Sequence, residues 1–319
     1  MTCRRCQHDT VKRFGTYGRR RIQRYRCKSC GATFSPPQPK PLGNHTTNLE
    51  TAEKIVGLLV EGMSVRAAAR FTGVDKNTIL DLLLTVGAKC RAVFDAKIRG
   101  VRPKHVQLDE LWCFVFKKEG RLRHGDSHTW GDAYTWTAID AETKLMISYL
   151  VAKRDGPSAL NFVTDLSRRV EGRLQITSDG FRPYIGAIEE CFGADVDFAQ
   201  LIKIYGKPDN AGPDWYGPAH VVETVPTPVS GDPDLDHIST SYVERSNLTV
   251  RMHLRRFTRL TNAFSKSLAH LKAAVDLFMA WYNLVRVHQT LRVTPAMEAG
   301  ITDHIWTIKE LLLWQSATN

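Results

Sequence analysis

The sequence lacks any apolar run that approaches the roughly 20 residues needed to cross a membrane. It also lacks an apolar signal core at its start, where Cys3, Arg4, Arg5 and Cys6 follow the first two residues. We therefore expect a soluble, cytosolic protein with no membrane partner.

Acidic residues are scarce in two blocks of the chain. Residues 1–50 hold eleven Lys or Arg against Asp9 and Glu50, and residues 245–292 hold nine against Asp276. The formal net charge is +11 over 319 residues. Solubility alone would explain the net charge but not this clustering, so the pattern favours an anionic partner such as nucleic acid.

Cysteine is sparse as well, and its number is odd: seven in the chain, which argues against a secreted disulfide framework. Four of the seven form two CxxC pairs with twenty residues between them, a spacing that predicts one tetrahedral, structural Zn²⁺. Gly15 and Gly18 suit a hairpin between the pairs. A redox role is the less favoured alternative in so basic a segment. We predict a zinc ribbon over 1–35 with the ligands Cys3, Cys6, Cys27 and Cys30.

A proline-rich segment at 36–50, with four prolines up to Pro41, is typical of a semi-rigid linker. After it the apolar periodicity becomes helical, and Ser64 and Asp75 are suitable N-caps on either side of a turn at Gly73. The pattern predicts a helix-turn-helix domain over 51–100, although a plain helical hairpin would read similarly. In such a domain the start of the second helix contacts DNA through Lys76, Asn77 and Thr78.

Residues 101–319 predict an α/β domain. Three strand-like segments, "HVQLDELWCFVF", "DAYTWTAID" and "KLMISYLVA", precede a helix, a strand ending at Asp179, a helix led by Pro183 and the strand "VDFAQLIKIY". The segment 206–237 contains six prolines and predicts an irregular insertion. Helical patterning returns from Thr240 and continues into a C-terminal helical segment.

Two adjacent acids, Asp109 and Glu110, interrupt the first of these apolar strands. Successive side chains of a strand face opposite sides, so only one of the two is expected to reach a given site. Asp179 ends another strand, and Glu244 lies on a predicted helix. Taken singly, Asp179 can be a turn residue and Glu244 a solvated acid. Three converging carboxylates would instead require divalent cations between them, either Mg²⁺ or Mn²⁺, two per active site.

Four segments carry a family resemblance: "VQLDELWCFV", "TSDGFRPY", "YVERSNLTVRMHLRRFTRLTNAFSK" and "WYNLVRVHQTLRVTPAMEAGI". They resemble the catalytic segments of IS1-family insertion-sequence transposases, and the two N-terminal motifs are similar to that family's DNA-binding part. The resemblance implies a ribonuclease-H-like mixed sheet with an Asp-Asp-Glu (DDE) triad at Asp109, Asp179 and Glu244. It also implies cleavage and transfer of double-stranded DNA at terminal inverted repeats, by a homodimer or higher oligomer associated with a prokaryotic nucleoid.

Basic residues near these motifs are expected to contact DNA phosphates. Two other functions remain open on the sequence: a zinc-ribbon and helix-turn-helix regulator whose ribonuclease-H-like domain is inactive, and a structure-specific nuclease of the same fold. Besides the helix-turn-helix residues, the predicted DNA-binding set is Arg19, Arg20, Arg21, Arg245, Asn247, Arg251, Arg255, Arg256 and Arg259.

Overall fold

The computed structural model describes residues 1–18, 21–36, 40–206, 220–259 and 261–315. It divides into two compact units, Met1–Asn44 and His45–Asn319. The boundaries predicted within the second unit, at residues 50/51 and 100/101, stay predictions.

The first unit is a small antiparallel sheet of β1 (Val11–Tyr17), β2 (Ile22–Cys27) and β3 (Thr33–Phe34), in that order. Tight turns hold both CxxC pairs, as the N–H of Gln7 donates to the Cys3 carbonyl and that of Gly31 to the Cys27 carbonyl. Gly31 has a φ of 72°, a conformation that favours glycine. The described residues of this unit bury few apolar side chains, so a metal is expected to supply much of its stability.

The second unit is built on a six-stranded sheet in the order β6-β5-β4-β7-β8-β9. β4 (His105–Val115), β5 (Gly131–Asp140) and β6 (Met146–Ala152) are antiparallel, whereas β7 (Leu174–Ser178) is parallel to both β4 and β8 (Val196–Gly206). The predicted mixed α/β architecture is therefore confirmed, with three antiparallel strands before the parallel ones.

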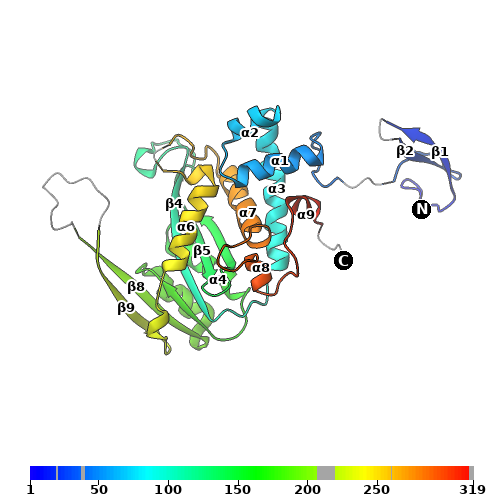
Figure 1. The fold of residues 1–319 in the computed structure, drawn as a ribbon. Coiled ribbons are helices and arrows are strands. Elements are labelled where there is room, and N and C mark those ends of the chain that lie inside the picture. Colours follow the sequence, from blue (N-terminus) through cyan, green and yellow to red (C-terminus); the bar gives the residue numbers. More distant parts are fainter. Residues whose placement is uncertain (19–20, 37–39, 207–219, 260, 316–319) are drawn as a thin grey trace. The chain divides into compact units, whose positions relative to one another are not determined.

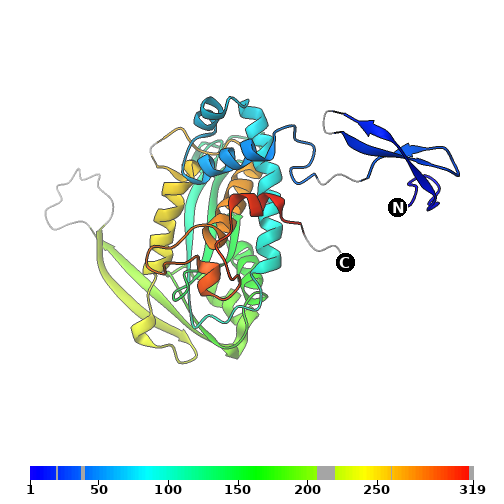
Figure 2. The same cartoon turned by 45° about the vertical axis from the view of Figure 1, so that its right-hand side comes forward.

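Helices cover both faces of this sheet (Figures 1 and 2). On one face, Trp136 of β5 packs against Phe162 of α4 (Gly156–Ser167) and Tyr184 of α5 (Pro183–Phe192). On the other lie α6 (Ser241–His253) and α7 (Leu268–Leu284); Tyr149 of β6 donates to Asp276 of α7. The short helices α8 (Pro295–Glu298) and α9 (Ile308–Leu313) follow.

Three helices precede the sheet: α1 (Leu49–Val60), α2 (Val65–Thr72) and α3 (Lys76–Lys97). As predicted, the Ser64 and Asp75 side chains cap α2 and α3, and Gly73 ends α2 in a left-handed conformation. α3 packs closely along α7, where Gly87 leaves no room for a side chain: an added Cβ would lie 2.6 Å from Ala273.

The prediction of an irregular insertion at 206–237 is wrong for its second half. Residues 220–230 form β9 (His220–Ser230), an 11-residue strand antiparallel to β8; residues 207–219 lie outside the described part. Pro226 and Pro228 misled the sequence interpretation. Because β9 is the last strand in the order of the described sheet, prolines two residues apart can direct their missing N–H positions away from β8. None of the helices in the described residues is long and apolar enough to span a membrane.

The contact between α3 and α7 predicts a contrast between two helical glycines. Gly87→Ala places a methyl group against the backbone of α7, and overpacking of this kind costs about 1–3 kcal/mol. In α1, Gly57→Ala meets only Ile308 Cδ1 at 3.5 Å and gains up to about 1 kcal/mol of helix propensity. Urea unfolding should therefore show a lower midpoint for Gly87→Ala and an equal or higher one for Gly57→Ala; equal midpoints would contradict the close packing.

Candidate functional site

The candidate site lies where β7 ends before its neighbours. β4 pairs with β7 only over His105–Gln107, and β8 pairs with it only up to Gln200. β4 nevertheless continues to Val115 along β5, and β8 to Gly206 along β9. A notch therefore opens beyond Ser178, at the carboxyl end of the parallel strands, which is the ligand-binding position of open α/β sheets.

Three carboxylates meet in this notch. Oxygen atoms of Asp109, Glu110 and Asp179 all lie within 4.8 Å of one another. Asp109 and Glu110 do face opposite sides: Asp109 accepts from Asn247 of α6, whereas Glu110 pairs across the sheet with Trp136, which packs on α4 and α5. The prediction that only one of them reaches the site is wrong: β4 pairs with β7 only up to Gln107, and beyond that pair both carboxylates come within 4.8 Å of Asp179.

Glu244 stands next to this group but outside it. Its carboxylate pairs with Lys203 of β8 and accepts from Thr240. The helix that carries it is fixed to β4: the Gln107 side chain accepts the N–H groups of Tyr242 and Val243, at 2.8 and 3.1 Å, and so satisfies two free donors at the start of α6.

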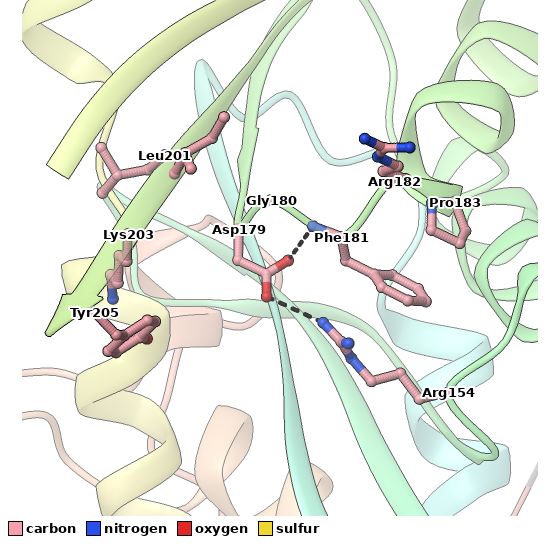
Figure 3. A pocket seen from close by; sticks show the side chains of 10 residues that line it. Arg154, Asp179, Gly180, Phe181, Arg182, Pro183, Leu201, Lys203 and Tyr205 are labelled. Atoms are coloured by element: carbon pink, nitrogen blue, oxygen red, sulfur yellow. Dashed lines mark hydrogen bonds and ion pairs between the residues drawn. The ribbon is translucent and has the colours of Figure 1, made fainter. Parts of the chain in front are cut away.

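Arg154, which the sequence did not single out, links two of the acids. It donates to Glu110 at 2.9 Å and to Asp179 at 3.2 Å while its guanidinium lies over the Phe181 ring (Figure 3). Asp179 also accepts from the Phe181 N–H. No local motif marks Arg154, since it lies between β6 and α4 and reaches the notch only through the fold.

A cavity of about 540 Å³ adjoins Asp179 and extends along β8. Figure 3 shows Lys203 and Tyr205 of β8 on one side of it and Phe181, Arg182 and Arg154 on the other. Cations and two aromatic rings thus stand beside the carboxylates, which suits a strand of nucleic acid with its phosphates and bases.

Burial and nearby negative charge change the titration of Asp109 and Glu110. Burial, followed by the charges of Glu110, Asp179 and Glu244, raises the pKa of Asp109 to about 7. Burial and the nearby Asp179 likewise raise the pKa of Glu110. Asp109 and Glu110 are therefore harder to ionise than they would be in water, and a bound cation would reverse the effect.

The residues of the notch fit a divalent cation. Carboxylate oxygens are the ligands that Mg²⁺ and Mn²⁺ prefer. One acceptor atom at the site, Asn247 Oδ1, is buried without a hydrogen-bond partner among the described residues. Unpaired buried acceptors of this kind need a donor or an ion.

The four cysteines of the first unit also fit a metal. Their Sγ atoms lie within 4.8 Å of one another, with Cys3–Cys30 and Cys6–Cys27 separations of 3.6 Å. A tetrahedral Zn²⁺ with Zn–S bonds of about 2.3 Å would set such separations near 3.8 Å. Backbone N–H groups, Cys6 first, lower the pKa of Cys3 to about 6, which favours the thiolate that binds metal.

The predicted DNA-binding residues fall in several places. Lys76 and Asn77 begin α3, and Arg255 and Arg256 lie in the short 3₁₀ helix after α6; all four line a second cavity. Asn247 is only 8% exposed and contacts Asp109. The remaining members are Arg21, Thr78, Arg245, Arg251 and Arg259, and Arg19 and Arg20 lie outside the described residues.

Comparison with known proteins adds little. No family model matches the chain, and no curated protein does. Thirteen chains of solved structures match, among them a piggyBac transposase synaptic complex with hairpin DNA, which is 12% identical over 86% of this chain and 71% of that chain, with a TM-score of 0.38. A superposition this loose says nothing about the activity of the present chain.

Metal binding at the notch should depend on pH through Asp109. Because its pKa is about 7, protons compete with Mn²⁺ below neutrality, and the affinity should fall by up to tenfold per pH unit as the pH drops below about 7. Titration calorimetry at about pH 6 and pH 8 measures this. An affinity that does not change with pH would contradict the raised pKa.

In the absence of metal, the raised pKa of Asp109 makes the stability of the folded protein depend on pH. The unfolded carboxyl ionises near 3.8 and the folded one near 7, so the stability that protonated Asp109 contributes at low pH is lost as the pH rises from about 3.8 to about 7. Asp109→Asn removes this loss and should melt a few degrees higher than wild type at about pH 8 in a chelator. A melting temperature below that of wild type would contradict it.

Removal of one thiolate should release zinc and unfold the first unit alone. Cys27→Ser is expected to lose the bound metal and the structure of Met1–Asn44, because a ribbon this small depends on its metal. Metal analysis, and proton NMR of the full chain, would measure this against Cys191→Ser in the second unit. Retention of one equivalent of zinc by Cys27→Ser would exclude Cys27 as a ligand.

Proposed function

We propose that the chain is a DNA transposase of an insertion sequence, with a ribonuclease-H-like core and a DDE triad of Asp109, Asp179 and Glu244. The observation that carries the proposal is the meeting of acids from separate segments in the notch beyond β7. The IS1-family resemblance of the sequence supports the choice of Glu244 as the third member, and its charge acts on Asp109.

The roles of the residues follow from their positions. Asp109, Asp179 and Glu244 would hold two Mg²⁺ or Mn²⁺ ions, which activate an attacking oxygen and stabilise the leaving one in phosphodiester displacement. Arg154 and Glu110 orient Asp179, and Asn247 orients Asp109 through its 2.6 Å hydrogen bond. Lys203 holds Glu244 and, with Arg182, presents positive charge to a phosphate at the cavity.

The rest of the molecule supports the same function. A zinc ribbon and a helix-turn-helix segment would bind the terminal inverted repeats, while the core cuts one strand and joins the freed 3′-hydroxyl to target DNA. Joining two ends requires at least two protomers. A protein of this kind works on the nucleoid in a prokaryotic cytoplasm.

Substitution of the triad tests the proposal. Asp109→Asn, Asp179→Asn and Glu244→Gln should each bind DNA of the element's own ends with wild-type affinity yet lose Mg²⁺-dependent cleavage by more than about 100-fold, beyond the 10- to 100-fold typical of an orienting partner. Glu110→Gln should fall within that lower range, and Glu189→Gln, an exposed acid of α5, should cleave normally.

Three outcomes would change the assignment. Normal cleavage by any triad variant removes that residue from the triad. A wild-type protein that binds the ends and never cuts would be a DNA-binding regulator with an inactive core. Nicks without joined products would identify a structure-specific nuclease.

A further inference from the structure

A second cavity, of about 740 Å³, lies where the N-terminal helices meet the segment that joins α6 to α7. Its walls are largely apolar and include Leu59, Leu80, Phe264 and Leu277. Five permanently charged side chains also line it, and all are basic: Arg66, Lys76, Arg255, Arg256 and Lys266.

This group of five cations has no counter-ion in the described part of the chain. None of the five lies within 4 Å of a carboxylate oxygen there, and no Asp or Glu lines the cavity. Elsewhere in the unit the buried Arg169 is paired with two aspartates. Cations clustered on an apolar wall repel one another, so their arrangement favours an anion from outside the chain.

Arg256 is the most informative of the five. Its side chain is half-buried, and its guanidinium donates to Ser265 Oγ at 2.9 Å. Burial lowers its pKa to about 10, and no nearby acid offsets the effect. A guanidinium held in this way is unfavourable to the fold on its own, which is expected of a residue kept for binding.

The start of α7 adds donors to the same cavity. Ser267 is its N-cap but makes no side-chain capping bond, so the first N–H groups of this 17-residue helix lack that partner. His270, in the first turn, has a buried Nε2 atom without a partner in the described residues. The helix dipole places partial positive charge at this end.

We propose that this cavity binds the phosphodiester backbone of the DNA that the notch cuts, with Arg256, Lys266 and the start of α7 holding phosphates and the apolar walls meeting deoxyribose. The inference rests on the proposed function. It also joins the helix-turn-helix residue Lys76 to the core residue Arg256 in one site, so that both segments hold a single DNA stretch.

The test uses the full chain and a fluorescein-labelled duplex carrying the element's ends, with anisotropy measured over a range of salt concentrations. Arg256→Met and Lys266→Gln should each lower the slope of log K against log salt by about 0.9 and weaken binding roughly tenfold. Lys309→Gln, an exposed cation of α9 away from the cavity, should leave the slope unchanged.

Thermal melting separates binding from a structural role. Arg256→Met should melt at or above the wild-type temperature, because it removes a desolvated charge. Wild-type slopes for both variants would overturn the inference. If Arg256→Met melts several degrees lower or cannot be purified folded, Arg256 has a structural role, and the slope of the double variant Arg255→Gln/Lys266→Gln decides: a wild-type slope there overturns the inference.

Failure of this inference differs from failure of the proposed function. If both variants have wild-type salt slopes and the protein cuts DNA, the cavity assignment is wrong and the proposed function stands. If both variants have reduced salt slopes but the wild-type protein never cuts DNA, the phosphate site stands and the transposase assignment is wrong. Equal binding of wild type and variants to anionic phospholipid vesicles would show that lipid does not use the site.

Discussion

A mismatch in strand length sets the geometry of the candidate site: β7 ends at Ser178 while β4 and β8 continue on either side. The notch that results lets carboxylates from both faces of β4 approach Asp179. An uninterrupted sheet would have kept Asp109 and Glu110 apart, because side chains of neighbouring residues leave a strand in opposite directions. The geometry of the site is therefore set mainly by which strands pair and where their pairing ends.

Charge is unevenly distributed between the two ends of α6. Near its start, four carboxylates face the cations Arg154 and Lys203, which leaves an excess of negative charge. Beyond its end, five cations line a cavity that contains no acid. Either arrangement reduces stability in the isolated protein. Both would be neutralised if divalent ions occupied the first site and a polyanion the second, so the two imbalances are consistent with one DNA-binding function.

Local features of the chain were predictable because they depend on short-range physics. The caps Ser64 and Asp75, the Pro183-led helix and the four-cysteine cluster follow from patterns of a few residues. β9 was missed because proline is compatible with a strand only at a sheet edge, and the sequence does not reveal which strand lies at an edge. Arg154 and Lys203 were missed because their partners are 25 to 44 residues away along the chain.

Asp109 and Glu110 leave β4 on opposite faces, as the alternation of side chains along a strand predicts. Both carboxylates nevertheless lie close to Asp179, because β7, the strand between β4 and β8, is short. The length of a neighbouring strand is a tertiary property that local sequence does not reveal. The contact between β4 and α6 also depends on the tertiary fold.

The Gln107 side chain, two residues before Asp109, accepts hydrogen bonds from N–H groups at the start of α6, and the buried Val243 and Val250 fix the rotation of the helix. Because α6 is held at its start and along its buried side, Glu244 and the cavity beyond Leu254 keep a constant separation. A helix held in this way can therefore fix the distance between the carboxylates of the notch and the basic cavity.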